Sequence, residues 1–288
     1  MRPSDLPTTV TDLAAGPIEY RFDRHGDETV VIFYGGHMRA GLALGEADFT
    51  GAGYSVLVPS RPGYGRTPLT TGTTPAGFAD VTAELCAHVG VGRLAAVVGV
   101  SAGGRTAVAM AARHPRLVER LLLESAVSFQ PWPGRFTRLG ARVVFHPAAE
   151  RATWAMMRAL LRTAPTLGLR SLMGSLSAKP VGDVLAALTP AERETAIGLF
   201  ARMRSGAGFC NDLIACPDLT AEVVQPALVI ATRTDAAVPF AHAEALTAGI
   251  PHARLLESTA DGHLIWLSPD HRAVTEQIRH FLSTPLTD

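Results

Sequence analysis

The sequence contains few charged residues and has no net charge. Only 18% of its 288 residues are charged, with 26 basic residues against 26 acidic ones, whereas an average soluble protein has roughly 25% charged residues. Lys179 is the only lysine. With no excess of basic residues, the sequence gives no sign of a surface that binds nucleic acid or an anionic membrane, so we expect neither as a partner. The 47% of hydrophobic residues are enough for a sizeable core, which excludes a disordered or fibrous protein.

Cysteines and long apolar runs are also scarce. The odd number of cysteines, Cys86, Cys210 and Cys216, is typical of a reducing compartment. The first residues lack the apolar stretch of a secretory signal. The nearest candidate for a membrane span, residues 94–112, carries Arg105 in its middle, and a span needs roughly 20 apolar residues. We therefore expect a cytoplasmic protein.

The motifs of nucleotide and metal sites are absent. No Gly-x-Gly-x-x-Gly follows the first expected strand, and the sequence has no Gly-Lys-Ser/Thr phosphate loop. No pair of histidines at i, i+4 and no His/Asp cluster has the spacing of metal ligands. We therefore expect neither a cofactor nor a metal.

The first 127 residues alternate short apolar runs with helical patterns. The expected strands cover residues 18–22, 30–34, 54–59, 93–100 and 118–125, and the expected helices cover residues 75–88 and 102–113. Residues 25–27 (HGD) predict a hairpin turn between the first two strands. Strict alternation of strand and helix predicts right-handed crossovers and a doubly wound parallel sheet.

From about residue 128 the pattern becomes helical for some 90 residues, and alternation then resumes. The expected later elements are helices at 153–162, 190–204, 240–248 and 264–282 and strands at 227–231 and 254–257. Thr189 and Glu192 form a predicted capping box. We expect one α/β core, made of residues 1–127 and 221–288, interrupted by a helical cap at residues 128–220.

The strongest motif is GVSAG at residues 99–103, where a buried strand gives way to a helix. A strained turn at such a junction can hold a serine hydroxyl clear of the backbone. Glycines on both sides are needed because the turn leaves no room for side chains. We therefore predict Ser101 as a nucleophile. The alternative is a packing turn made of small residues.

A serine nucleophile needs a base, and the base needs an orienting group. His263 follows the last expected strand, at the sheet edge where Ser101 also emerges, and we predict it as the base. Asp235 leaves the same edge after strand 227–231 and is the predicted orienting acid. Glu124, at the end of the preceding strand, is a rival acid.

Catalysis at a carbonyl also needs donors for the developing oxyanion. The backbone N–H of Ala102, at the start of a helix, is the first expected donor. We assign the second to Gly36 in residues 34–38 (YGGHM), because two glycines there allow the backbone to approach a substrate closely. His37 is the adjacent alternative. Losing one such donor typically costs about 2.7–4 kcal/mol of transition-state stabilisation.

Taken together, these motifs resemble the α/β-hydrolase superfamily over essentially the whole chain. The resemblance rests on YGGHM (34–38), SRPGYGRT (60–67), GVSAGG (99–104), TRTDAAVP (232–239) and ADGHLIW (260–266). It implies a doubly wound, mostly parallel eight-stranded sheet with an inserted helical cap. It also implies a catalytic triad of Ser101, Asp235 and His263. The chain departs from the family pattern at Tyr34, where many members carry histidine, and at His37, where proline is frequent.

The expected reaction is acyl transfer through an acyl-enzyme on Ser101. We expect hydrolysis of a small or medium, largely apolar carboxylic ester or lactone by a carboxylesterase-like enzyme. Two alternatives remain open. One is different chemistry on the same triad, by a thioesterase, acyltransferase, C–C bond hydrolase or perhydrolase. The other is a protein that keeps the fold but binds a ligand without turnover.

The substrate pocket is expected beneath the helical cap. Apolar residues at helical spacing more often belong to a core, yet a helical lid over such a turn usually creates an apolar cavity. The residues expected to contact substrate are His37, Met38, Trp154, Met157 and Phe209. Arg61 is expected to help hold the core together. The protein is expected to act on a small molecule as a monomer or homodimer.

Overall fold

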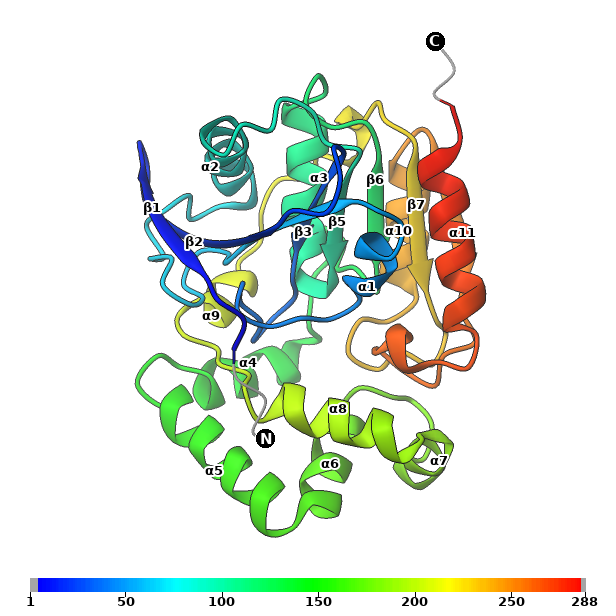
Figure 1. The fold of residues 1–288 in the computed structure, drawn as a ribbon. Coiled ribbons are helices and arrows are strands. Elements are labelled where there is room, and N and C mark those ends of the chain that lie inside the picture. Colours follow the sequence, from blue (N-terminus) through cyan, green and yellow to red (C-terminus); the bar gives the residue numbers. More distant parts are fainter. Residues whose placement is uncertain (1–4, 286–288) are drawn as a thin grey trace.

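The computed structural model describes residues 5–285, without the side chains of Arg135 and Phe136, and has a twisted eight-stranded sheet at its centre (Figure 1). The strands are β1 (Thr9–Leu13), β2 (Gly16–Asp23), β3 (Thr29–Phe33), β4 (Ser55–Pro59), β5 (Ala96–Val100), β6 (Leu121–Glu124), β7 (Ala227–Ala231) and β8 (Ala253–Glu257). Their order across the sheet is β1-β2-β4-β3-β5-β6-β7-β8. β1 and β2 run antiparallel to their neighbours, and all other pairs are parallel. The predicted fold class is confirmed.

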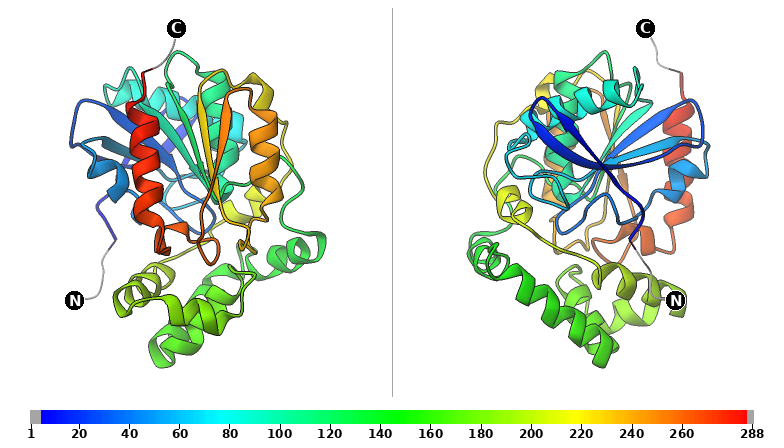
Figure 2. Two further views of the ribbon diagram at one scale, coloured as in Figure 1. Left: turned by 90° about the vertical axis from the view of Figure 1, so that its right-hand side faces the viewer. Right: turned by 60° about the vertical axis from the view of Figure 1, so that its left-hand side comes forward.

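Helices cover both faces of the sheet (Figure 2). One face packs against α2 (Pro75–His88), α3 (Gly104–Arg113) and α10 (Ala241–Gly249). The other packs against α1 (Ala47–Thr50) and α11 (His271–Ser283). Because both faces are covered, β3, β4, β5, β6 and β7 are buried along their whole length. Their near-continuous apolar sequences follow from this burial.

The expected hairpin between residues 18–22 and 30–34 is wrong. β2 pairs with β1 and β4, whereas β3 lies between β4 and β5. The hairpin is formed one strand earlier, between β1 and β2. β1 has the sequence TVTDL and lies at the edge of the sheet, partly exposed. Its polar side chains gave no apolar run from which a strand could be predicted.

Capping signals predict the starts of α2 and α8 (Pro190–Phe200) correctly, whereas α8 ends at Phe200 instead of about residue 204 and the last helix begins late. α2 begins at Pro75, and the Thr74 side chain accepts a hydrogen bond from the Gly77 N–H, as expected. The predicted capping box of Thr189 and Glu192 opens α8. The last helix, expected from about residue 264, begins only at His271. A short 3₁₀ turn, η3 (Ile265–Leu267), occupies the preceding residues.

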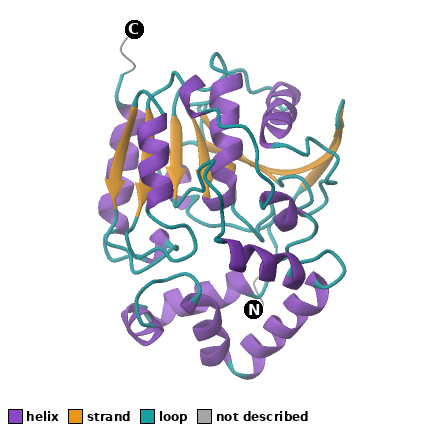
Figure 3. Cartoon of the chain, turned by 180° about the vertical axis from the view of Figure 1, so that it is seen from behind, coloured by secondary structure: helices purple, strands orange, loops and turns teal. Residues whose placement is uncertain are grey.

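The segment between β6 and β7 consists of helices that lie beyond the carboxyl ends of the parallel strands (Figure 3). These insertion helices are α4 (Arg135–Val144), α5 (Glu150–Thr163), α6 (Pro165–Gly174), α7 (Val181–Ala187), α8 and α9 (Gly208–Asp212). The expected boundaries at residues 128 and 220 stay a prediction. Within residues 5–285 there is no helix with the length and apolar character required to cross a bilayer.

Candidate active site

Ser101 lies at the sharp turn between β5 and α3, at the start of the 3₁₀ turn η1 (Ser101–Gly103). Its φ of 51° is in the left-handed region, which residues other than glycine seldom adopt. A Cβ atom on Gly103 would overlap the carbonyl oxygen of Phe33. The turn is therefore strained and closely packed, as the motif predicts, and such strain is a common property of functional sites.

His263 and Asp235 form a hydrogen-bonded pair on neighbouring loops. His263 Nδ1 lies 2.7 Å from Asp235 Oδ2, and both residues are buried. The other carboxylate oxygen, Oδ1, accepts hydrogen bonds from the N–H groups of Ala237 and Val238, each at 2.8 Å. Three hydrogen bonds therefore fix the carboxylate, which in turn can hold the imidazole in the tautomer that carries its hydrogen on Nδ1.

The segment after β6 connects the serine turn to the histidine loop. The Ser125 hydroxyl donates to the carbonyl oxygen of His263 at 3.1 Å. Two residues later, the Val127 N–H donates to the carbonyl oxygen of Ser101 at 2.8 Å. The three residues proposed from sequence as a triad therefore gather at one edge of the sheet. Their catalytic roles remain predictions at this point.

A segment of the insertion helices also bonds both loops of the acid–base pair. Between α6 and α7, the Ala178 N–H donates to the carbonyl oxygen of Thr234 at 2.8 Å. The carbonyl oxygen of Leu176 accepts a hydrogen bond from the His263 N–H at 2.9 Å. The insertion helices therefore help to set the backbone around Asp235 and His263.

Residues 34–38, which we call the oxyanion loop, follow β3 and lie next to Ser101. A Cβ atom on Gly35 would lie 2.7 Å from the Cβ of Ser101 and 3.2 Å from its hydroxyl oxygen. Gly36 lies next along the chain, beneath the ring of Phe209. Ala102 is buried at the start of η1. Of the two expected oxyanion donors, Ala102 directly follows Ser101, and Gly36 directly follows Gly35, the residue that packs against Ser101; their role as donors stays a prediction.

Comparison with known proteins shows the family of this chain. The sequence pattern of the alpha/beta hydrolase fold matches residues 29–269. The chain belongs to this family. It is 29% identical over 262 residues to the uncharacterized hydrolase YcgS of Bacillus subtilis, covering 88% of this chain and 91% of that one.

Two further similarities extend over most of the chain. It is 31% identical to the pimeloyl-[acyl-carrier protein] methyl ester esterase of Aromatoleum aromaticum over 244 residues, which are 77% of this chain and 86% of that one. An alpha/beta hydrolase fold protein from Nakamurella multipartita has the same fold, with a TM-score of 0.79 at 23% identity, covering 96% and 99% of the two chains. Hydrolases are therefore prominent among the proteins that this α/β-hydrolase resembles.

Glu124, the rival acid, is the last residue of β6 in this α/β-hydrolase. The carboxylate bonded to His263 belongs to Asp235. Glu124 is almost completely buried, and burial together with the charge of Asp48 raises the pKa of its carboxyl group to about 8. Asp48 itself accepts a hydrogen bond from Thr275 and pairs with His271. Asp235 is therefore the acid in position to orient the imidazole.

The raised pKa of Glu124 predicts a pH-dependent loss of stability. In the unfolded chain a glutamate titrates near pH 4.3, so between about pH 4.3 and pH 8 the folded state binds more protons. The free energy of unfolding therefore falls as the pH rises through this window. Glu124→Gln, which cannot ionise, should raise the midpoint of thermal unfolding at pH 9 and change it much less at pH 5. Circular dichroism at both pH values measures this, and equal shifts would contradict the assignment.

Arg61 does more than hold the core, the role expected from sequence. Its Nε donates to the carbonyl oxygen of Tyr34 at 2.6 Å, at the start of the oxyanion loop. Its other nitrogens bind the two carboxylate oxygens of Asp212 at 2.5 and 2.8 Å, and the Tyr64 hydroxyl donates to the same carboxylate. Burial alone would lower the pKa of the guanidinium, but Asp212 raises it above its ordinary value. Arg61 thus ties the oxyanion loop to the end of α9.

Removing the carboxylate of Asp212 should strongly destabilise the protein. Both side chains of the Arg61–Asp212 pair are buried, so Asp212→Ala would leave the guanidinium without its counter-charge. We expect the free energy of unfolding to fall by about 3–5 kcal/mol, measured by urea denaturation. Glu257→Ala is the matched control, because Glu257 and Arg233 form an exposed pair of the kind that contributes about 1 kcal/mol or less. Equal losses in the two variants would contradict this prediction.

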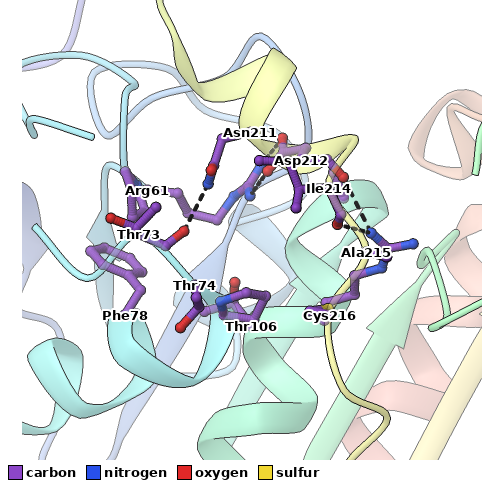
Figure 4. A pocket seen from close by; sticks show the side chains of 14 residues that line it. Arg61, Thr73, Thr74, Phe78, Thr106, Asn211, Asp212, Ile214, Ala215 and Cys216 are labelled. Atoms are coloured by element: carbon purple, nitrogen blue, oxygen red, sulfur yellow. Dashed lines mark hydrogen bonds and ion pairs between the residues drawn. The ribbon is translucent and has the colours of Figure 1, made fainter. Parts of the chain in front are cut away.

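Two cavities adjoin the site. One of about 100 Å³ lies behind Ala102, with Asn211 and Asp212 on one side and Thr74 and Thr106 on the other (Figure 4). A smaller one, of about 20 Å³, touches His263. Its lining is mostly apolar and includes Met173, Leu176, Val184, Leu188, Leu264 and Leu267. The space beside the imidazole is therefore small and apolar.

The five residues expected to contact substrate are found in two settings. The rings of Phe209, Phe145 and Trp154 surround the imidazole of His37, with centroid distances of 4.2, 4.6 and 5.2 Å. Met38 and Met157 pack into the large core cluster that joins the sheet to the insertion helices. Sequence patterns did not indicate Ser205, which bonds the ring of His37 from 168 residues away. Substrate contact by the five residues stays a prediction.

Proposed function

We propose that this α/β-hydrolase is a serine esterase that cleaves a small or medium, largely apolar carboxylic ester or lactone. The observation that carries the proposal is the 2.7 Å hydrogen bond between His263 Nδ1 and Asp235 Oδ2, at the sheet edge where Ser101 lies on a strained turn. A nucleophile held on a strained turn next to an oriented imidazole is the arrangement that acyl transfer requires.

The reaction proceeds in two steps. His263 takes the proton of Ser101 as the hydroxyl oxygen attacks the ester carbonyl, and the N–H groups of Gly36 and Ala102 stabilise the oxyanion. His263 then protonates the departing alkoxide, which leaves as the alcohol while the acyl group stays bonded to Ser101. A water molecule, deprotonated by His263, attacks this acyl group; the bond to the Ser101 oxygen breaks, the proton held by His263 passes to that oxygen, and the carboxylic acid is released. Asp235 stabilises the imidazolium that forms in each step.

The surroundings of the site support an uncharged, apolar substrate. The cavity beside His263 is lined mostly by leucine, valine and methionine side chains. Aromatic rings crowd the other side of the oxyanion loop. The similarity to a methyl ester esterase is consistent with an ester of this kind.

The test combines active-site labelling with turnover. Purified protein should react with a fluorophosphonate probe, with the adduct on Ser101 in the peptide map, and should hydrolyse p-nitrophenyl acetate and butyrate. Labelling without ester turnover would replace the esterase proposal by another reaction of the same triad, such as acyl transfer. Absence of labelling in folded protein would overturn the nucleophile and favour a ligand-binding protein.

A further inference from the structure

A chain of hydrogen bonds runs from the insertion helices to the oxyanion loop. The indole Nε1 of Trp154, on α5, donates to the hydroxyl oxygen of Ser205 at 2.7 Å. That oxygen lies 2.8 Å from Nδ1 of His37, in the oxyanion loop. Ser205 is completely buried, and Trp154 is nearly so. Water therefore does not compete for these two hydrogen bonds.

The donor and the acceptor in each of these two hydrogen bonds follow from the chemistry of the groups. An indole N–H can only donate, so the Ser205 oxygen accepts from Trp154 and keeps its own hydrogen to give. The Ser205 hydroxyl therefore donates to His37 Nδ1, the acceptor within its reach. This hydrogen bond requires a neutral His37 imidazole with its hydrogen on Nε2. Burial lowers the pKa of His37 to about 3, in agreement with a neutral ring.

His37 is also held through its backbone. Its carbonyl oxygen accepts a hydrogen bond from the Arg204 N–H at 3.1 Å. The Arg204 side chain pairs with the buried carboxylate of Glu150 at 2.7 Å, and the same carboxylate accepts from the Ser205 N–H at 3.3 Å. The φ of His37 is 66°, a conformation that a non-glycine residue keeps only where its surroundings enforce it.

We propose that His37 is a positioning residue for the oxyanion donor Gly36, and that Trp154 and Ser205 set its position. We call Glu150, Trp154, Arg204, Ser205 and His37 the His37 latch. Gly36 directly precedes His37. The latch fixes the backbone of His37 and the peptide unit that joins it to Gly36, and this restricts the direction of the Gly36 N–H. The proposal rests on the proposed function, because Gly36 has this role only if Ser101 attacks a carbonyl.

The latch changes the role expected for two residues. His37 itself fills the space between Phe145, Trp154 and Phe209. In the latch, His37 and Trp154 therefore hold the conformation of the oxyanion loop instead of contacting the substrate. It also makes the catalytic shape of that loop depend on the docking of the insertion helices.

The test removes the hydrogen bonds of the latch one at a time. Trp154→Phe keeps an aromatic ring but loses the N–H, and Ser205→Ala loses the hydroxyl. With p-nitrophenyl acetate, each should lower kcat about 10- to 100-fold, because a displaced oxyanion donor weakens mainly the transition state, while KM changes less than about twofold. The affinity of a boronic acid, which mimics the tetrahedral intermediate, should fall in parallel with kcat. The double variant should be no slower than the slower single variant, because both changes break one chain.

Ser55→Ala is the matched control for loss of a buried hydroxyl. Like Ser205, Ser55 uses its hydroxyl both as donor and as acceptor. It donates to the carbonyl oxygen of Gly26 at 2.6 Å and accepts from the His25 N–H at 3.0 Å. Ser55 lies at the opposite end of the sheet from Ser101. This variant should lose thermal stability but keep kcat and KM.

The outcomes separate the latch from the proposed function. An active wild type whose Trp154→Phe and Ser205→Ala variants are folded and keep its kcat would overturn the latch and leave the esterase intact. A rise in KM at unchanged kcat would also overturn it, in favour of substrate contact. A folded wild type that neither reacts with fluorophosphonate nor hydrolyses any ester would overturn both proposals.

Discussion

Replacing Ser101 with alanine is expected to lower kcat for p-nitrophenyl acetate by about 10⁴- to 10⁶-fold and to abolish labelling by fluorophosphonate. The loss is large because the variant has no atom to form the acyl-enzyme, while the oxyanion donors and the imidazole remain. Thermal unfolding should change little, because alanine keeps the Cβ packed against Gly35. Steady-state kinetics and mass spectrometry of the labelled protein measure the two effects.

Ser283→Ala, at the exposed end of α11, is the control for this measurement and should keep full activity and labelling. A Ser101→Ala protein that retains more than about 1% of wild-type kcat, after purification that excludes contaminating esterases, would show that another group attacks the substrate. The mechanism would then have to be rebuilt around that group.

The second large effect is expected at Asp235. Asp235→Asn keeps the shape of the side chain, but its amide no longer offers a charged acceptor to His263 Nδ1 and favours the wrong tautomer. We expect kcat to fall by about 10⁴-fold with little change in KM. The readout is the steady-state rate of p-nitrophenyl acetate hydrolysis.

Glu124→Gln is the matched control, because Glu124 is the rival acid and lies at the end of the neighbouring strand β6. It should keep kcat near the wild-type value, since its carboxyl group is not bonded to His263. If Glu124→Gln were the slower of the two variants, the acid would lie after β6 and the assignment of Asp235 would be wrong.

The sequence predicted Asp235 as the acid but left Glu124 as a rival. Glu124 ends one buried parallel strand and Asp235 follows the next, so each reaches the edge of the sheet where Ser101 emerges. The choice depends on the loop after β7, in which the N–H groups of Ala237 and Val238 hold the Asp235 carboxylate. Such a loop shape depends on backbone angles that spacing alone does not fix.

Patterns of apolar residues predicted the central strands and the edge strand β8 well but missed the other edge strand, β1. β5 and β7 are buried on both faces and appear in the sequence as unbroken apolar runs. β1 is partly exposed and has alternating polar residues, so it was missed and its hairpin was assigned to β2 and β3. Burial produces the apolar signal, and β1 has little of it.

Contacts between distant segments were not predictable in the same way. Arg61 and Asp212 are 151 residues apart, and His37 and Ser205 are 168 residues apart. Each residue type is common in loops, and a periodic pattern reports only the environment of its own segment. These contacts exist because the insertion helices fold back over the carboxyl ends of the strands, an arrangement that appears only in three dimensions.

The order of strands in the sheet has a consequence for the newly made chain. Ser101 follows β5, in the middle of the sheet, whereas Asp235 and His263 follow β7 and β8, which are added last and at one edge. On the ribosome, a chain that has already exposed Ser101 still has neither the carboxylate nor the imidazole that we propose to activate it. The proposed hydrolytic activity therefore arises only after β7 and β8 have been made, later than the oxyanion loop and the insertion helices.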